Sequence, residues 1–93
     1  LTAIPFADED EAVRIANDVP YGLAAYAFTN SAANVDRITD EVEAGNVSIN
    51  TLEASVAATP FGGVKESGFG REGGAEGILH YTVVKTVSHR MEI

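Results

Sequence analysis

The glycine-rich segment from Pro60 to Gly74 holds several charged side chains that could do chemistry. Six of its fifteen residues are glycine, and Lys65, Arg71 and Glu72 lie among them. Glycine at this density gives up side-chain packing, so a folded protein uses it where the backbone takes φ > 0 or approaches another group closely. A carboxylate in such a loop can hold a structural salt bridge, and this role is open for Glu72.

Three more side chains in and before this segment suit the binding of a small molecule. Phe61 stands between a proline and two glycines, so we expect it to project into a cavity wall, with plain core packing as the alternative. Ser55 leaves room and supplies a hydroxyl donor, which suits a carboxylate, but an ordinary solvated serine explains it equally well and Glu53 would repel an anion. Asn50 ends an alternating run, where asparagine usually forms a turn.

The surrounding sequence predicts alternating strands and helices that would position these side chains. Asp8 with Glu11 forms an N-cap pair, and Ser31 caps a second helix that Gly45 is expected to end. The expected order is a strand over 1–6, a helix up to 17, a strand over 23–29, a helix from 32 to 44, a strand over 46–50, a loop over 51–72, a helix over 75–81 and a strand over 82–88. This alternation indicates an α/β fold, and the uniformly apolar run 23–29 indicates a strand covered on both faces.

Length and composition exclude several classes of function. The chain has 93 residues, a net charge of −8 and a pI near 4.4, which argues against nucleic acid and anionic membrane surfaces as partners. No apolar run is long enough to span a bilayer. There is no cysteine, and only His80 and His89 could ligate a metal through imidazole, so we expect no metal site. We expect a cytoplasmic location, with which the cysteine count is compatible.

The glycine-rich segment, PFGGVKESGFGREGG, resembles the C-terminal signature PFGGxKxSGxGRExG of the NAD(P)-dependent aldehyde dehydrogenase superfamily. Residues 5–29 resemble the family's PFxxxDEAIxxANDxxYGLAAxVFT block, and residues 44–50 resemble its AGxVxIN strand. The resemblance implies that residues 1–81 are the C-terminal portion of the catalytic domain. It also implies that residues 82–93 are an oligomerisation strand and tail, through which the protein forms a homo-oligomer, a dimer or tetramer; an internal edge strand is the alternative.

The resemblance also implies roles for the candidate substrate-binding residues. The motif is closest in wording to succinic semialdehyde dehydrogenases, in which a serine at the place of Ser55 hydrogen-bonds the distal carboxylate of the substrate. It implies that Phe61 lines the substrate tunnel and that Asn50 lies near the entrance to the active site.

Three positions of the glycine-rich segment take further roles from the resemblance. Glu72 matches a glutamate that lies behind the general base and can order water or relay protons. Lys65 and Gly68 match positions whose backbone carbonyls bind a monovalent cation in some betaine-aldehyde-type members.

Several parts of such an enzyme are missing from this chain. The resemblance implies a catalytic cysteine, a glutamate base, an oxyanion-stabilising asparagine and a dinucleotide-binding motif, but the chain has no cysteine and no GxGxxG within a strand–helix unit. The chain starts without Met, on an apolar run, so we expect a fragment whose missing elements lie upstream in the rest of its own polypeptide.

We therefore expect the fragment alone to be inactive. The complete protein would oxidise an aldehyde, foremost succinic semialdehyde, with NAD or NADP through a cysteine thiohemiacetal. Two alternatives stay open: a dehydrogenase for another aldehyde, and a non-catalytic interaction or oligomerisation module.

Overall fold

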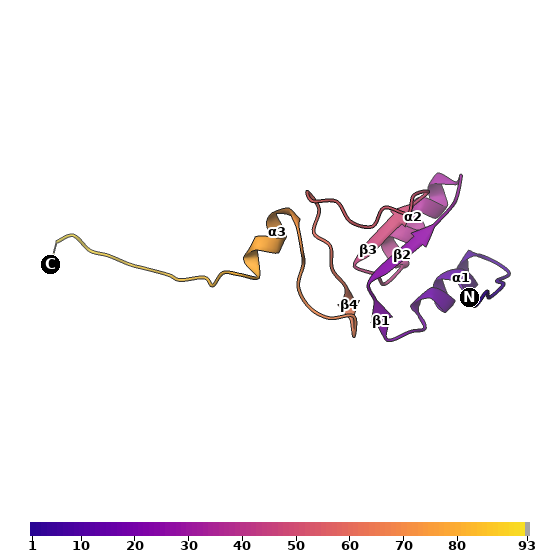
Figure 1. Cartoon of the computed structure of the whole chain (residues 1–93), viewed down its shortest axis with the longest axis horizontal. Helices are drawn as coiled ribbons and strands as arrows, with labels where there is room; N and C mark the ends of the chain where they lie inside the picture. The colour runs from indigo at the N-terminus through magenta and orange to yellow at the C-terminus, as the bar shows by residue number, and fades with distance from the viewer. Residues whose placement is uncertain (93) are drawn as a thin grey trace.

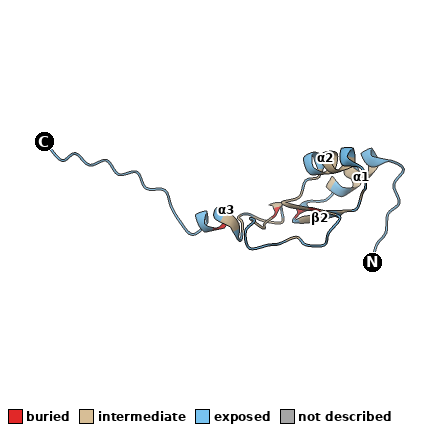
Figure 2. Cartoon of the chain, turned by 90° about the horizontal axis from the view of Figure 1, so that it is seen from above, coloured by how far each residue is buried: buried red, intermediate tan, exposed pale blue. Residues whose placement is uncertain are grey.

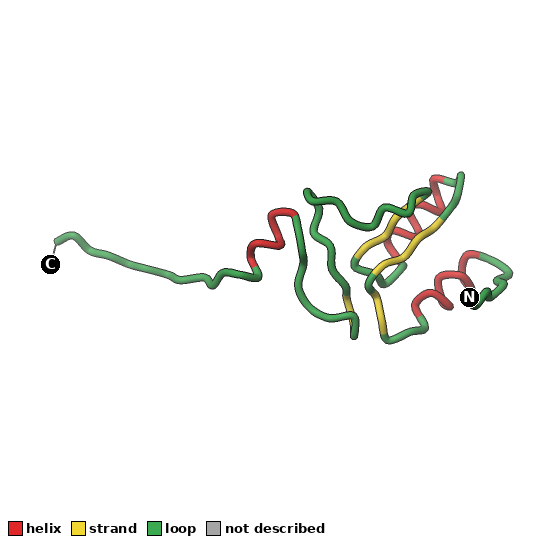
Figure 3. Tube along the Cα trace, in the orientation of Figure 1, coloured by secondary structure: helices red, strands yellow, loops and turns green. Residues whose placement is uncertain are grey.

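The computed structural model describes residues 1–92, which form an elongated body of 72 × 26 × 23 Å (Figure 1). The helices and strands lie in one half, and an extended C-terminal tail forms the other end (Figure 3). The elements are α1 (Glu9–Asn17), β1 (Tyr21–Gly22), β2 (Ala24–Ala27), α2 (Ala32–Glu41), β3 (Asn46–Ile49), β4 (Val64–Lys65) and α3 (Gly74–Leu79). The predicted α/β class is confirmed.

Two small sheets organise the described residues. Strands β2 and β3 are parallel, in a register that sets Ala24 opposite Asn46 and Ala27 opposite Ile49. Helix α2 makes the crossover between them, as parallel neighbours require. Helices α1 and α2 both lie on one side of this sheet (Figure 2). Strands β1 and β4 form a separate antiparallel pair, which joins residues 21–22, between α1 and β2, to the glycine-rich segment.

Both predicted N-caps are present. The Asp8 side chain accepts a hydrogen bond from the Glu11 backbone N–H at 2.9 Å, and Glu11 Oε2 accepts from the Ala7 N–H at 2.8 Å. These reciprocal bonds satisfy backbone donors that the first turn of α1 leaves free. The Ser31 hydroxyl accepts from the Asn34 N–H at 3.3 Å and begins α2 in the same way.

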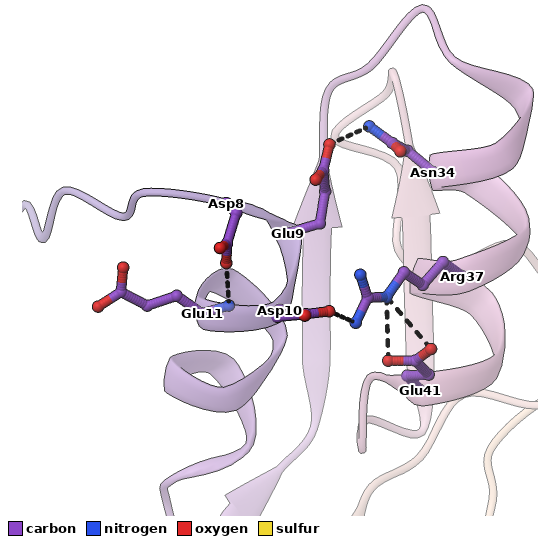
Figure 4. A network of polar contacts seen from close by, with 7 residues as sticks. All are labelled: Asp8, Glu9, Asp10, Glu11, Asn34, Arg37 and Glu41. Carbon is purple, nitrogen blue, oxygen red and sulfur yellow. Dashed lines mark hydrogen bonds and ion pairs between the residues drawn. The ribbon is translucent and has the colours of Figure 1, made fainter.

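A polar network joins α1 to α2 (Figure 4). The Arg37 guanidinium on α2 pairs with Asp10 on α1, and its Nε donates to Glu41 at 3.1 Å and 3.2 Å. The hydrogen bond to Asp10 and then that to Glu41 raise the pKa of Arg37 above its ordinary value. Asn34 adds a bond from its Nδ2 to Glu9 at 3.3 Å. The network fixes the two helices against each other at their solvent-facing side.

Two predictions for the first half of the chain are wrong. Residues 1–6 form no strand, because no strand of the described residues pairs with them. Gly45 does not end the second helix: α2 stops at Glu41, and Val42 takes an extended conformation as its C-cap. Val42 lines the apolar groove between the helices and β2.

The second half differs from expectation in two places. The segment 51–72, predicted to be all loop, contains β4 and an isolated antiparallel bridge between Phe61 and Glu72. Residues 82–88 form no strand among the residues that the structure describes, since a strand is defined by a ladder partner. Their pairing with another subunit therefore stays a prediction. The predicted helix over 75–81 is confirmed as α3, one or two residues earlier.

The described residues bury very little. No hydrophobic side chain among them is buried, and the four buried residues are Gly22, Ser48, Gly63 and Gly77. Large apolar side chains stay open to solvent, including Phe28 at 67%. Parallel strands are normally covered on both faces, whereas here helices lie on only one face of the β2–β3 sheet.

Candidate functional site

A cleft of about 330 Å³ lies against the glycine-rich segment. Phe61 and Glu72 both line it, and their backbones pair across it, each N–H donating to the other's carbonyl at 2.7 Å. Directly opposed residues of an antiparallel pair project to the same side. The sequence-predicted aromatic wall and the predicted carboxylate therefore share one cleft.

The Arg71 side chain stabilises the backbone of the glycine-rich segment through hydrogen bonds. Its Nη1 donates to the carbonyls of Gly63 at 2.9 Å and Gly70 at 2.8 Å. A Cβ on Gly62 would lie 2.3 Å from the Gly70 carbonyl oxygen, so only glycine permits this fold of the backbone. Arg71 therefore holds this loop through hydrogen bonds to its backbone. Among the described residues Glu72 makes no ion pair. Glu72 is also exposed to solvent, at the edge of the cleft.

The segment is docked on the start of β3 by backbone contact. A Cβ on Gly45 would lie 1.8 Å from the Gly62 carbonyl oxygen. That same oxygen accepts from Asn46 Nδ2 at 2.9 Å, and Asn46 Nδ2 also donates to the Leu23 carbonyl at 2.7 Å. Gly45, predicted as a helix terminator, is needed instead for this close approach.

Ser55 and Asn50 do not line the cleft that contains Phe61. Ser55 is exposed, and no hydrogen bond within residues 1–92 uses its hydroxyl. Asn50 adopts φ 57°, and its side chain bonds the backbone of Thr29 on the neighbouring segment rather than its own local backbone, as a turn-forming asparagine would. Their roles toward substrate stay predictions.

The candidate cation-binding carbonyls lie in a tight turn. The Gly68 N–H donates to the Lys65 carbonyl at 3.3 Å, and Gly68 takes φ 111°. Within residues 1–92, no group of three or more His, Cys, Asp or Glu side chains could hold a metal ion. The monovalent cation therefore stays a prediction that rests on the resemblance alone.

Sequence reasoning missed His80 as a cleft residue. The position of a Cβ on Gly70 lies 3.6 Å from the His80 ring, so the imidazole packs over the bare glycine backbone. Tyr81 and Phe69 line the same cleft. The available signal was the position of His80, directly after the short helix that follows the glycine-rich segment. Nothing in its spacing distinguished it from a surface residue.

The glycine motif of this chain does not fit a dinucleotide-binding site. Gly68, Gly70 and Gly73 do spell GxGxxG, but only the two-residue strand β4 precedes them and only the six-residue α3 follows. Dinucleotide sites need this motif between a parallel strand and a full helix, whose N-terminus receives the pyrophosphate. Strand β4 is antiparallel to its neighbour, so this chain supplies no such unit.

No helix among residues 1–92 combines the length and the apolar character that crossing a membrane requires.

Comparison with known proteins identifies a family and several relatives of this chain. The profile of the aldehyde dehydrogenase family matches residues 1–87. A succinate-semialdehyde dehydrogenase [NADP(+)] from Saccharomyces cerevisiae is 49% identical over 79 residues, which are 85% of this chain and 16% of that protein. The chain thus spans about a sixth of the length of the curated relatives it matches.

Two solved structures are also similar. Succinate-semialdehyde dehydrogenase from Burkholderia pseudomallei superposes with a TM-score of 0.83 at 50% identity, covering 86% of this chain and 17% of that one. Betaine aldehyde dehydrogenase from Staphylococcus aureus, solved in complex with NAD+, gives a TM-score of 0.80 at 41% identity, covering 84% and 16%. Because the family profile matches residues 1–87 of the 93, this chain belongs to the aldehyde dehydrogenase family.

Proposed function

We propose that this chain is the C-terminal portion of the catalytic domain of an NAD(P)-dependent aldehyde dehydrogenase, with an oligomerisation strand at its end. The complete protein would oxidise succinic semialdehyde to the carboxylic acid through a cysteine thiohemiacetal. The chain itself has no cysteine, so the nucleophile has to be supplied by the rest of the polypeptide.

The observation that carries this proposal is the cleft at the glycine-rich segment. Phe61 provides an apolar wall, the exposed Glu72 carboxylate stands beside it, and Arg71 keeps the backbone in place without using a carboxylate partner. The cleft combines aromatic side chains with the polar side chains of Ser67, Arg71, Glu72 and His80, and a concave site where a few polar groups converge is a usual form of small-molecule site. Phe61 would contact the aldehyde chain, and Glu72 would hold or relay a proton at its edge.

The substrate proposal rests on Ser55 and on the relatives. Two of the similar proteins are succinate-semialdehyde dehydrogenases. An exposed serine hydroxyl can donate to a carboxylate, and the Ser55 hydroxyl is not used by any hydrogen bond within residues 1–92. A betaine aldehyde dehydrogenase is also similar, so oxidation of another aldehyde is the alternative within the family.

The cofactor is proposed for the complete protein only. One relative was solved with NAD+ and another is named for NADP(+), so both nucleotides belong in the assay. The cofactor would bind outside this chain, whose glycine motif does not fit a dinucleotide. The cytoplasmic location inferred from the sequence stays a prediction.

A non-catalytic interaction module is the second candidate. Two observations favour it: the absence of cysteine, and an extended tail that exposes Val83, Val84 and Val87 by 75–99%. Such a module would bind a sheet edge of another chain without any turnover.

Enzyme assays on two proteins distinguish these candidates. The complete polypeptide and the 93-residue chain are each given succinic semialdehyde, with NAD+ or NADP+, and reduced cofactor is followed by absorbance. We expect turnover by the complete protein and none by the 93-residue chain. A complete protein that reduces neither cofactor with succinic semialdehyde, butanal or betaine aldehyde would contradict the enzyme proposal and favour the module.

A further inference from the structure

Lys65 lies where the glycine-rich segment meets the ends of two helices. Its Nζ donates to the backbone carbonyls of Asn17 at 3.1 Å and Val19 at 3.3 Å, and it forms an ion pair with Glu43. These three partners match the three donors of an ammonium group. The side chain is 27% exposed, so this cation is held against the protein rather than extended into water.

The helix ends beneath Lys65 are themselves joined. Asn17 is the last residue of α1, and its Nδ2 donates to the carbonyl of Glu41, the last residue of α2, at 2.8 Å. Its Oδ1 accepts from the Glu43 N–H at 2.9 Å. A cation near helix C-termini is favoured by the helix dipole. Lys65 therefore links the segment to a point that both helices share.

The next two residues of the segment bind the same stretch of chain. The Glu66 N–H donates to the Pro20 carbonyl at 2.9 Å. The Ser67 hydroxyl accepts from the N–H of the buried Gly22 at 2.9 Å. Lys65 itself takes φ 54°, an unusual left-handed conformation for a lysine. The surrounding contacts thus hold the backbone at Lys65 in a conformation that it would otherwise avoid.

We infer that Lys65 is a positioning residue, whose ammonium sets the glycine-rich segment against the C-terminal ends of α1 and α2 and so fixes the Phe61 wall of the cleft. Its effect on turnover rests on the proposed function, while its effect on the backbone of residues 61–72 does not. Lys65 is not among the residues that line the cleft, so it acts on Phe61 and Glu72 through the backbone between them.

The test uses Lys65→Met in the complete polypeptide, with Arg14→Met as the matched control. Arg14 is 67% exposed on α1, and within residues 1–92 it pairs only with Glu11, one turn away, so its loss removes the same charge without touching the segment. Hydrogen exchange of residues 61–72 and steady-state kinetics with succinic semialdehyde are measured on both variants. Lys65→Arg, which keeps the charge and the donors, provides the rescue. Glu43→Gln, which removes one of the three partners, provides a milder variant should Lys65→Met not fold.

We expect Lys65→Met to speed hydrogen exchange over residues 61–72. We also expect it to raise KM on the order of tenfold, with a smaller change in kcat, because a displaced Phe61 weakens the binding of the substrate and of the transition state alike. Lys65→Arg should recover most of both losses, and Arg14→Met should show neither. A role in folding alone would lower kcat at unchanged KM, because less of the protein would be active, and that result would overturn the inference. So would unchanged exchange in Lys65→Met. A wild-type protein that oxidises no aldehyde would contradict the proposed function, and the exchange measurements alone would then decide the role of Lys65.

Discussion

Asn50 binds Thr29 with both ends of its side-chain amide. Oδ1 accepts from the Thr29 N–H at 2.9 Å, and Nδ2 donates to the Thr29 carbonyl at 2.9 Å. Since the Asn50 N–H also donates to the Ala27 carbonyl at 2.8 Å, this residue extends the β2–β3 ladder past the end of both strands. The left-handed φ of 57° is one that asparagine adopts more readily than most residues.

Replacing Asn50 by Ala should loosen this end of the sheet. Two hydrogen bonds are lost and alanine tolerates the left-handed conformation poorly, so we expect a local loss of about 1–3 kcal/mol. Native-state hydrogen exchange of the Thr29 and Asn50 amides measures it. Asn30→Ala, one residue beyond Thr29 and exposed, is the control. Equal protection in the two variants would show that the amide pairing contributes nothing to stability.

Replacing Gly45 by Ala should displace the glycine-rich segment. The new Cβ would lie 1.8 Å from the Gly62 carbonyl oxygen, a backbone atom that cannot move alone. We expect a destabilisation of at least about 1–3 kcal/mol together with a loss of kcat/KM, measured by thermal unfolding and by the aldehyde assay. Ala33→Gly, at an exposed position of α2, measures the ordinary glycine–alanine difference. A Gly45→Ala protein with wild-type unfolding and activity would contradict the close packing described.

Replacing Ser55 by Phe should distinguish a carboxylate-bearing substrate from a plain aldehyde. Loss of a hydrogen bond to a charged group costs about 1.5–3 kcal/mol, and the aromatic ring adds steric exclusion. The ratio of kcat/KM for succinic semialdehyde to that for butanal should fall accordingly in the complete protein. Ser55→Thr keeps the hydroxyl and should preserve most of the ratio. An equal change for both aldehydes would leave only an effect of tunnel size.

Replacing Val87 by Pro tests assembly through the C-terminal segment. Proline removes a backbone donor and is not accommodated in a central strand, so we expect a lower oligomeric state or a lower Tm at low protein concentration. Light scattering across a dilution series measures the change, and Val87→Thr, which keeps the donor and the β-branched shape, is the control. Undiminished assembly of the proline variant would favour the internal-edge interpretation.

The sequence predicted those features of the fold that depend only on residues close to one another along the chain. The caps at Asp8 and Ser31 and the strand predicted over 46–50, found as β3 over 46–49, depend on residue types and spacing within a few positions, and the structure has them. The prediction for Gly45 was wrong because the Gly62 carbonyl that requires a glycine there lies seventeen positions along the chain.

The composition of the cleft could be predicted only in part. Phe61 was recognisable because it stands between a proline and two glycines, and Glu72 because it matches a position of the family motif. His80 could not be recognised, since its packing over Gly70 depends on how α3 returns to the segment. The strand predicted over 1–6 was wrong because an apolar run makes a strand only where a neighbouring strand offers hydrogen bonds.

The bridge between Phe61 and Glu72 limits how this protein can vary in length during evolution. The residues between them leave the bridge at Phe61 and return to it at Glu72, and their tip lies at the exposed Phe69, beyond the anchored residues 65–67. Insertions at that tip would lengthen the excursion and leave both cleft residues opposite each other. A single-residue insertion beside either bridge residue would instead shift the pairing by one and turn that side chain to the opposite side. Natural insertions and deletions should therefore be found at the tip and be absent from the two ends.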